Sequence, residues 1–542
     1  AGRQMQKDFE PVLERQIHYF VNGASGIQHI GQRDIAWIRI SNAAADKGFK
    51  LEHFGKILHA RFHADFGAIV DKVQVTIYTE PAQVQRWLER AREAYDFRNK
   101  RLADLTDNAV EEFYSCTLCV PPKQDVILPD GSFLPVEQLV EGAVDNGLRP
   151  VLSFAENHLT SRMMGELFIN PAPEKLVRIA LRNGNDLTLT ANHKVLVDRL
   201  EGLTWVPAGK LEVGDAVLDV MPEFTPAKVE PPYIVDYLPD DYKVSDDEFY
   251  TQLSSWILAR FGSLSEAARR LSIPYRRLYS ALYPAKHLSH QRLTLGEIKA
   301  ILPAVGQSWE AIKGTLRRFQ AGAVLNRTHL DTDILYAAGL VASDGCVRWR
   351  GPGGRSGVYV QFTNTTPALN ARFAAIVSAA FDRPPTEQTY PPKVSQSGSL
   401  VIESRQDVTV SVAGNTLFGR LLNGLGIGLP GHEQKWTGYA ISALSPDLVA
   451  AFLRGLFDGD GHVTGQRAFI TTRSRLEARH IHLLLKKLGI ASYISPITRG
   501  YQVATSSDGD TIRFRELVGS EHPDKYARLQ AIQVLSLIHI SE

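Results

Sequence analysis

The sequence predicts a multidomain chain with an α/β N-terminal part, an all-β segment, a small pair of helices and an α+β domain made of two similar halves. Three observations support this prediction. The chain has 542 residues, enough for three or four domains of ordinary size. Its pattern changes at Cys119, from mixed helices and strands to short strands and tight turns. One set of motifs occurs twice between residues 331 and 530.

The composition excludes several classes of protein. Apolar residues make up 44% of the chain and charged residues 22%, as in a globular protein with packed cores. The net charge is only +1, so any basic surface must be local. No apolar run reaches the roughly 18 residues of a membrane span, and we expect no membrane contact. There is no signal peptide, and the 3 cysteines cannot form a disulfide framework, which predicts a cytoplasmic protein.

Residues 1–118 have the pattern of an α/β piece. "DIAWIRIS" (34–41) is typical of a strand, and "DKVQVTIYT" (71–79) alternates apolar and polar residues. "PAQVQRWLERAREAYDFRNKRL" (81–102) is a charged helix that a proline opens. The chain begins without methionine, and we expect it to be a fragment.

Residues 119–222 are expected to form an all-β segment. "KLVRIALRNGNDLTLTANHKVLV" (175–197) contains two strands joined by an Asn/Gly/Asp turn, a strong hairpin signal. "WVPAGKLEVGDAVL" (205–218) adds further short strands. Residues 223–245 are rich in Pro, Asp and Tyr and are expected to be a linker.

Residues 246–325 are expected to form a small helical DNA-recognition subdomain. "FGSLSEAARRLSIPYRRLYSALY" (261–283) predicts two short helices broken at Ser272–Pro274, the layout of a helix-turn-helix. The alternative is a plain helical hairpin with a solvated basic face. Four basic side chains are available for DNA phosphates: Arg269, Arg270, Arg276 and Arg277.

Residues 330–530 contain an internal duplication. "LYAAGLVASDG" (335–345) is repeated as "AFLRGLFDGDG" (451–461), and "FTNTTPALNAR" (362–372) as "FITTRSRLEAR" (469–479). More loosely, "FGRLLNG" corresponds to "FRELVGS", and a lysine follows each, Lys435 and Lys525 respectively. Two copies in the same order predict two similar halves related by a pseudo-twofold axis.

Each half presents an apolar helix that ends in Asp-Gly. Small residues such as Gly339 and Gly455 let the two helices pack closely, and Asp344 and Asp460 then lie together at the helix C-termini. Two converging carboxylates suit Mg²⁺, which can activate water for phosphodiester cleavage. Lys435 and Lys525 add positive charge for the transition state or general-base help. The alternative for either copy alone is that Asp-Gly simply ends an amphipathic helix.

"AAGLVASDG" (337–345) and "LRGLFDGDG" (453–461) resemble the paired motifs of LAGLIDADG homing endonucleases. The resemblance implies a saddle of two αββαββα-like halves that grips double-stranded DNA with β-ribbons. It also implies metal ligation by Asp344 and Asp460 and central lysines at Lys435 and Lys525. The first motif departs from the family pattern at Ala342, where an acidic residue is usual.

Cys119 followed by "VPPKQDVILPDG" resembles the opening of an intein, and "TANH" (190–193) resembles its Thr-x-x-His motif. The resemblance implies a splicing (Hint) fold whose N-terminal part is residues 119–222. Cys119 would attack the carbonyl of Leu118, and His193 would protonate the departing amide nitrogen, helped by Thr190 and Asn192. Metal ligation by Cys119 and a buried strand histidine at 193 are the alternatives.

Residues 1–118 resemble the β subunit of CO dehydrogenase/acetyl-CoA synthase through "GIQHIGQRDIAWIRIS" (26–41), "FGAIVDKVQVTIYT" (66–79) and "FYSCTLC" (113–119). The resemblance implies that Cys116 ligates a [4Fe–4S] cubane next to nickel in the spliced host only. It also implies association of that host with CO dehydrogenase subunits and a corrinoid protein. The alternative for Cys116 is an inert buried thiol.

The C-terminus departs from the intein pattern, because no His-Asn pair followed by Cys, Ser or Thr is present. We expect a C-terminal truncation, with residues 531–542 an artefactual tail and no complete splicing in cis. The DNA target is expected to be the uninterrupted host gene around the SCTLC codons. Two other functions remain open, a DNA-binding protein that has lost catalysis and an acyltransferase fragment without splicing.

Overall fold

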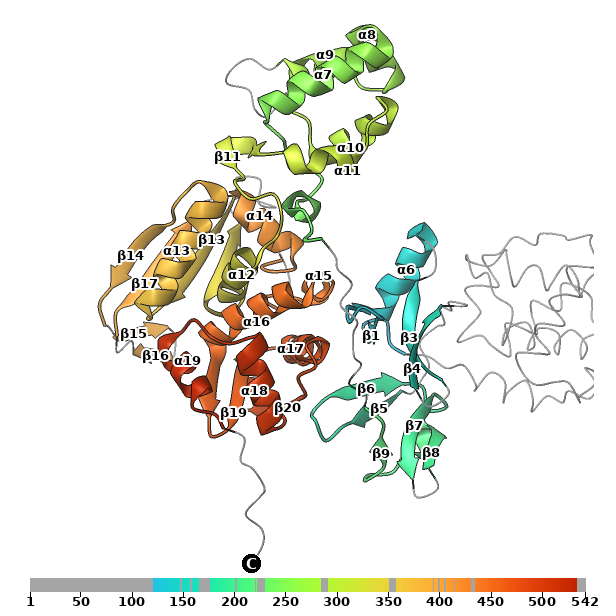
Figure 1. The fold of residues 1–542 in the computed structure, drawn as a ribbon, viewed down its shortest axis with the longest axis vertical. Coiled ribbons are helices and arrows are strands. Elements are labelled where there is room, and N and C mark those ends of the chain that lie inside the picture. The colour runs from blue at the N-terminus through green and yellow to red at the C-terminus, as the bar shows by residue number, and fades with distance from the viewer. Residues whose placement is uncertain are drawn as a thin grey trace, which may run out of the picture. The chain divides into compact units, whose positions relative to one another are not determined.

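The computed structural model describes residues 120–533, apart from gaps at 147–148, 156–157, 165–175, 200–201, 220, 222–229, 284–290, 350–356, 393, 398–399, 404–405, 415 and 430–433 (Figure 1). The predicted host part, Cys116 and Cys119 included, lies outside the described residues. The chain divides into two compact units. The first includes Leu134–Arg182 and Asp186–Val220, and the second Asp130–Phe133, Asn183–Asn185 and Met221–Glu542.

The first unit is built mainly from short antiparallel strands. The hairpin predicted within 175–197 is present as β5 (Val177–Ala180) and β6 (Asp186–Leu189), paired from Val177–Leu189 to Ala180–Asp186. A second sheet has the order β8-β7-β9. Leu189, Val195 and Ala208 form the core between these strands. The other strands are β1 (Asp125–Ile127), β2 (Phe133–Pro135), β3 (Pro150–Ala155), β4 (His158–Met163), β7 (Lys194–Arg199), β8 (Gly202–Pro207) and β9 (Ala216–Val217).

The prediction that residues 119–222 are all-β is wrong at one place. Helix α6 spans Val136–Asn146. Its sequence, VEQLVEGAVDN, places apolar residues at positions 136, 139, 140, 143 and 144, the spacing of a helix that buries one face. Leu139 on this stripe is buried, at 3% exposure. The helical period was present in the sequence and was overlooked among the strand signals.

A helical subdomain opens the second unit. It contains α7 (Asp247–Phe261), α8 (Leu264–Arg270), α9 (Tyr275–Leu282), α10 (Leu295–Ala304) and α11 (Trp309–Ile312). The chain leaves α7 through Gly262 in the left-handed conformation, with φ of 74°, and Ser263 caps α8 by accepting from the Glu266 amide. Residues 230–245, predicted to be a linker, differ from that prediction. They pack instead, because Ile234, Val235 and Val244 are fully buried apolar anchors.

The rest of the second unit consists of two halves with the same succession of elements. The first half is α12 (Thr332–Asp344), β12 (Gly345–Trp349), β13 (Val358–Asn364), α13 (Pro367–Phe381), β14 (Thr386–Tyr390), β17 (Val408–Ala413) and α14 (Thr416–Gly424). The second half is α16 (Pro446–Asp460), β18 (Gly461–Thr464), β19 (Arg467–Thr472), α17 (Arg475–Lys487), β20 (Ser492–Ile497), β21 (Gly500–Thr505) and α18 (Asp508–Leu517).

Both halves form a four-stranded antiparallel sheet with one topology. The strand orders are β12-β13-β17-β14 and β18-β19-β21-β20, so the first strand of each sheet follows directly from α12 or α16. The duplicated motifs fall on equivalent elements, which confirms the repeat read from the sequence. The first half also carries a hairpin of β15 (Val394–Ser397) and β16 (Leu400–Glu403), and α15 (Tyr439–Ser442) and α19 (Pro523–Gln530) complete the unit.

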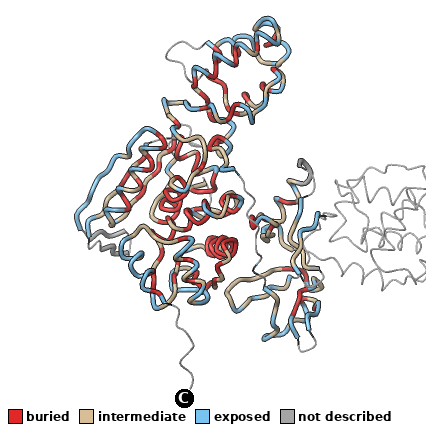
Figure 2. The backbone as a smooth tube through the Cα atoms, in the orientation of Figure 1, coloured by how far each residue is buried: buried red, intermediate tan, exposed pale blue. Residues whose placement is uncertain are grey.

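The core of this unit lies around α12 and α16 (Figure 2). Every residue of α12 from Ile334 to Ser343 is buried. Helices cover one face of each sheet; in the first half, Phe373 of α13 packs on Phe362 of β13 with ring centroids 5.0 Å apart. An apolar helix that is buried on all sides is what a central packing element requires.

Candidate functional site

The candidate site is built on the close contact between α12 and α16. A Cβ added at Gly339 would lie 2.1 Å from the Phe452 carbonyl oxygen, and one at Gly455 would lie 2.1 Å from the Tyr336 carbonyl oxygen. The equal values reflect the pseudo-twofold axis between the helices. Only glycine permits this approach, because any Cβ would overlap the backbone of the opposite helix.

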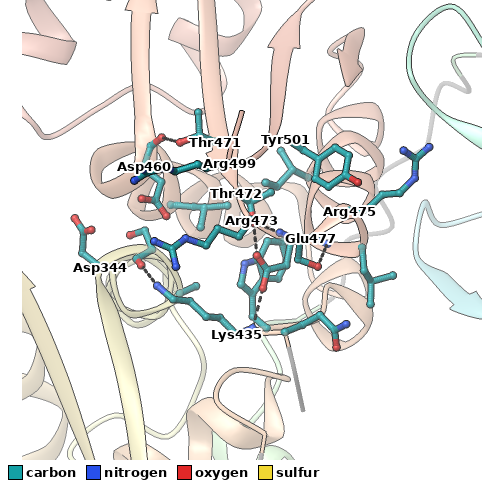
Figure 3. Close-up of a pocket in the computed structure, with 18 of the residues that line it drawn as sticks. Asp344, Lys435, Asp460, Thr471, Thr472, Arg473, Arg475, Glu477, Arg499 and Tyr501 are labelled. Atoms are coloured by element: carbon teal, nitrogen blue, oxygen red, sulfur yellow. Dashed lines mark hydrogen bonds between the residues drawn. The ribbon is translucent and has the colours of Figure 1, made fainter. Parts of the chain in front are cut away.

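This contact brings Asp344 and Asp460 to one pocket (Figure 3). Each is the last residue of its helix. Burial raises the pKa of Asp344 above its ordinary value. Burial, together with the nearby Asp344 charge, raises the pKa of Asp460 to about 6. The two carboxylates therefore form a desolvated like-charge pair, which is costly unless a cation neutralises it.

The two carboxylates have different hydrogen-bond partners. Asn364, at the end of β13, donates from Nδ2 to Asp344 Oδ2 at 2.7 Å. In the motif alignment Thr471 takes the place of Asn364, and its hydroxyl donates to the backbone oxygen of Asp460 at 2.9 Å. The sequence reasoning missed Asn364, although its position two residues after Phe362 in the repeated motif could have revealed it.

Lys435 and Lys525 each return to the C-terminus of the helix in their own half. Lys435 Nζ donates to the Ser343 carbonyl oxygen, next to Asp344. Lys525 Nζ donates to the carbonyl oxygens of Phe457, Asp458 and Gly459 at 2.7–2.9 Å, next to Asp460. Burial lowers the pKa of Lys525. Both ammonium groups favour the ionised carboxylates, so each half contributes one aspartate and one lysine.

The donor set fits a hard divalent cation such as Mg²⁺. Both carboxylates lie at one pocket, and serine and threonine residues also line it. No group of three or more His, Cys, Asp or Glu side chains that could hold a metal occurs among the described residues. A cation held by Asp344 and Asp460 would therefore take its remaining oxygen ligands from water or a substrate phosphate, as Mg²⁺ commonly does.

Three arginines of the second half line the same pocket, and the sequence reasoning missed them. Arg473 and Arg475 follow β19, and Arg499 lies in the turn between β20 and β21. Arg473 and Arg499 are exposed, whereas Arg475 lies over the Tyr501 ring at 5.6 Å. Guanidinium groups beside a pair of carboxylates suit a phosphate backbone. In Figure 3 these side chains surround the carboxylates on the side of the second half.

The TANH residues lie in the first unit, in the tight turn between β6 and β7. The His193 amide donates to the Thr190 carbonyl at 3.0 Å, and Thr190 is buried at 7% exposure. The His193 carbonyl accepts from the Ala208 amide at 2.8 Å, which fixes the turn against the next strand segment. Asn192 Nδ2 is buried and finds no acceptor among the described residues. The geometry of these residues toward Cys119 lies outside the described part of the chain.

The four arginines of the helical subdomain have unequal surroundings. Arg269 and Arg270 both pair with Glu266, and their side chains are 71% and 59% exposed. Arg276 is exposed. Arg277 is not available as predicted, because it pairs with Glu297 at 2.7 Å and donates to the Gln291 and Arg292 carbonyls. Its burial between α9 and the start of α10 makes it a structural residue.

Two family models match parts of the chain. Residues 1–84 match the CO dehydrogenase/acetyl-CoA synthase complex β subunit, and residues 447–519 match the LAGLIDADG-like domain. The chain carries a domain of each family. Both resemblances read from the sequence are confirmed. The LAGLIDADG match begins within α16 and ends after α18, so it covers most of the second half of the duplicated domain.

Relatives of two different kinds match the chain. The carbon monoxide dehydrogenase/acetyl-CoA synthase α subunit of Moorella thermoacetica is 52% identical over 118 residues, 22% of this chain and 16% of the relative. An acetyl-CoA decarbonylase/synthase β subunit of Methanopyrus kandleri is 42% identical over 133 residues, 24% of this chain and 28% of the relative. The chain therefore spans less than a third of either protein. One subunit of the A-type ATP synthase of Methanopyrus kandleri is 28% identical over 436 residues, 75% of this chain and 39% of the relative.

Solved homing endonucleases are similar to part of the chain. Mesophilic variants of I-DmoI are 17% identical with a TM-score of 0.27, over 35% of this chain and 97% of theirs. I-WcaI bound to its DNA recognition sequence is 15% identical with a TM-score of 0.27, over 38% of this chain and 88% of its own. Separately, none of the helices in the described residues is long and apolar enough to cross a membrane.

Proposed function

We propose that this chain is a precursor in which a splicing segment with a nested LAGLIDADG DNA endonuclease interrupts an acetyl-CoA synthase β subunit. The observation that carries the proposal is the pair of unrelated relatives. Acetyl-CoA synthase subunits align with no more than a quarter of the chain, whereas a protein of the ATP synthase aligns with three quarters of it. A long segment shared by proteins of different function is what a mobile insertion would leave.

The endonuclease centre is proposed to act as two related half-sites on the two DNA strands. Asp344 and Asp460 would hold Mg²⁺, which when bound polarises phosphate oxygens and lowers the pKa of a ligated water. Hydrolysis forms a bond from water oxygen to phosphorus and breaks the bond from phosphorus to the leaving sugar oxygen, which ends protonated. Lys435 and Lys525 place one positive charge at each half-site, where negative charge develops on the phosphate. Arg473 and Arg499 are proposed to bind neighbouring phosphates.

The splicing segment is proposed to begin with an acyl shift at Cys119. The Cys119 sulfur bonds to the Leu118 carbonyl carbon, the Leu118–Cys119 C–N bond breaks, and the released nitrogen becomes an amine after taking a proton. His193 is proposed to supply that proton, and Thr190 and Asn192 to polarise the amide. The buried Asn192 amide without an acceptor supports a role for this turn toward a group outside the described residues.

The host and the helical subdomain complete the proposal. After splicing, Cys116 would ligate a [4Fe–4S] cluster that neighbours nickel, and the host would associate with CO dehydrogenase subunits and a corrinoid protein. Arg269, Arg270 and Arg276 are proposed to contact DNA phosphates from α8 and α9.

A cleavage assay tests the endonuclease proposal. A plasmid carrying the uninterrupted host gene around the SCTLC codons is incubated with the full chain and Mg²⁺, beside a plasmid without that segment. We expect one double-strand break in the first plasmid only, and none with Asp344→Asn or Asp460→Asn. Binding without cutting would favour the alternative of a DNA-binding protein that has lost catalysis. Bound nickel and iron without cutting would favour the acyltransferase alternative.

A thiol cleavage assay tests the splicing proposal separately. Excess thiol or hydroxylamine should release a fragment of residues 1–118, detected by its mass, because a thioester at Leu118 is open to attack. The matched control Cys119→Ala should release nothing. Release from both chains, or from neither, would refute a thioester at this position.

A further inference from the structure

The segment that carries Lys525 is held by a buried carboxylate that the proposed chemistry does not use. Asp458 in α16 is 1% exposed. Its Oδ2 accepts from the Glu521 amide at 2.8 Å and from the Tyr336 hydroxyl at 2.7 Å, and its Oδ1 accepts from the Ser520 hydroxyl. Ser520 and Glu521 lead directly into α19, which carries Lys525. Asp458 therefore fixes the start of the segment whose lysine returns to the end of α16.

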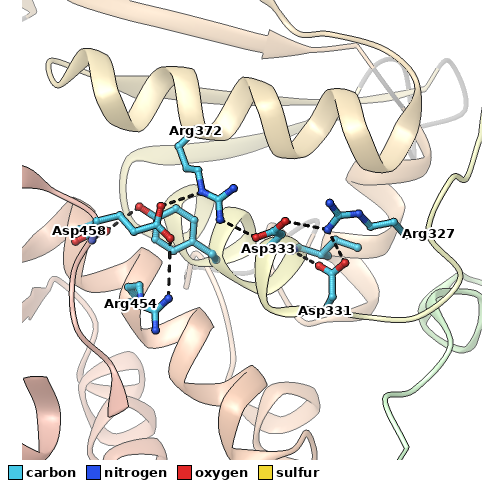
Figure 4. Close-up of polar contacts among 9 residues, drawn as sticks. Arg327, Asp331, Asp333, Arg372, Arg454 and Asp458 are labelled. Atoms are coloured by element: carbon cyan, nitrogen blue, oxygen red, sulfur yellow. Dashed lines mark hydrogen bonds and ion pairs between the residues drawn. The ribbon is translucent and has the colours of Figure 1, made fainter. Parts of the chain in front are cut away.

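Ion pairs add to this attachment (Figure 4). Arg372 of α13 donates to Glu521 at 2.9 Å and to Asp333 of α12 at 2.7 Å. Arg454 of α16 donates to the Val518 carbonyl. Residues 518–521 are thus connected to α12, α13 and α16. A buried carboxylate that accepts three hydrogen bonds orders its donors, because each donor would otherwise lose a partner away from water.

The segment that carries Lys435 is held by a different buried carboxylate. Glu477 of α17 is 5% exposed. Its Oε1 accepts from the Lys435 amide at 2.8 Å, and its Oε2 accepts from the Thr472 hydroxyl. Glu477 belongs to the second half, whereas the Lys435 side chain returns to Ser343 at the end of α12. The position of Lys435 thus depends on a residue across the pseudo-twofold axis.

Neither carboxylate has a counterpart in the other half. The aligned motifs place Ala342 opposite Asp458 and Asn370 opposite Glu477. Asn370 is buried and donates to the Asn364 and Thr366 carbonyls, so it holds its own turn instead of a lysine segment. The two halves reach the same lysine placement by unlike means.

We propose that Asp458 and Glu477 are positioning residues, Asp458 for Lys525 and Glu477 for Lys435, and that each thereby controls cleavage of one DNA strand. The strand assignment rests on the proposed function. It follows from the pairing of Lys435 with the Asp344 end and Lys525 with the Asp460 end, because the two strands of a duplex are related by a twofold axis in the same way. Loss of either carboxylate should impair one half-site and leave the other intact.

A labelling experiment tests the positioning without relying on nuclease activity. The full chain and its variants are treated with a limiting amount of an acylating reagent, and lysine modification is read by mass spectrometry. Asp458→Ala should raise the modification rate of Lys525 about tenfold and leave Lys435 unchanged, because the released segment exposes its amine. Glu477→Ala should do the reverse. Alanine suits α16 here, since Ala342 occupies the same position in α12.

Three further variants separate positioning from general loosening. Asp458→Asn and Glu477→Gln keep an acceptor for the held amide and should restore most of the protection. Asp508→Ala removes an ion pair with Arg467 elsewhere in the second half and should leave both lysines as in the wild type. Equal increases at both lysines in both alanine variants, or no increase at the paired lysine, would overturn the proposal.

Strand-resolved cleavage tests the functional consequence. With each DNA strand labelled separately, Asp458→Ala should slow the cutting of one strand by roughly 10- to 100-fold, and Glu477→Ala should slow the other, so nicked products of opposite polarity accumulate. Equal slowing of both strands would refute the strand assignment. If the wild-type chain cuts no DNA, the proposed function fails, while the labelling result still decides whether the carboxylates position the lysines.

Discussion

Replacement of Gly339 by alanine tests the helix contact on which the site depends. The added Cβ would lie 2.1 Å from the Phe452 carbonyl oxygen and 2.8 Å from the Leu456 amide nitrogen. Side-chain carbons keep at least about 3 Å from such atoms, so α12 and α16 would have to separate by roughly 1 Å. Asp344 lies five residues further along the same helix and would move with it.

The expected cost follows from two opposing effects. Overpacking of a rigid core costs about 1–3 kcal/mol or more, and here the obstacle is backbone, which cannot rotate away. Alanine in place of a helical glycine gains about 1 kcal/mol of helix propensity. We expect a net loss of about 2 kcal/mol in the free energy of unfolding, which for a domain of this size lowers Tm by roughly 4–8 °C.

Thermal unfolding followed by circular dichroism measures this loss. The matched control is Gly509→Ala in α18, where the added Cβ would meet only Ser507 Oγ at 3.7 Å. That variant should melt within about 2 °C of the wild type or above it. Gly455→Ala should behave as Gly339→Ala does, because the contact is symmetric. If Gly339→Ala melts as the control does, the close packing of α12 on α16 is refuted.

Three further predictions concern charge. Above pH 6, Asp460→Asn should raise the free energy of unfolding without metal by about 2 kcal/mol, because the raised pKa of Asp460 makes its ionised form costly in the folded state; added Mg²⁺ should stabilise only the wild type, and calorimetry with and without Mg²⁺ checks both. Burial lowers the pKa of His480 to about 3, so the unfolded chain takes up this proton near pH 6.5 and the folded chain does not; stability should fall as pH drops from 6.5 toward 3, by at most about 1.4 kcal/mol per pH unit. His480→Asn, which retains an acceptor for the Gly438 amide, should flatten that slope in urea titrations, and an unchanged slope would exclude His480 as its source. Arg499→Ala should reduce the salt dependence of DNA binding by about one phosphate contact in fluorescence titrations, whereas loss of affinity with an unchanged slope would contradict a phosphate contact.

Much of the LAGLIDADG domain was predictable because its pattern occurs twice. The repeated motifs located α12, α16, both aspartates and both lysines, since a duplicated chain folds each copy in the same way. The helix α6 was missed because its 3.6-residue period was short and lay among strand signals. The packing of residues 230–245 was missed because Pro, Asp and Tyr are equally compatible with a linker and with a buried turn.

The sequence by itself determined which residue types stand at each half-site, because the motifs carry their own local structure: an apolar helix, a terminal Asp-Gly and a following strand. Only the tertiary structure decided what surrounds them. Asn364 on Asp344, Asp458 on the Lys525 segment and Glu477 on the Lys435 segment join residues 20, 63 and 42 positions apart. Arg277 looked free in sequence and is paired with Glu297 in the fold. Such contacts depend on how the helices and sheets pack, and local sequence periodicity does not specify them.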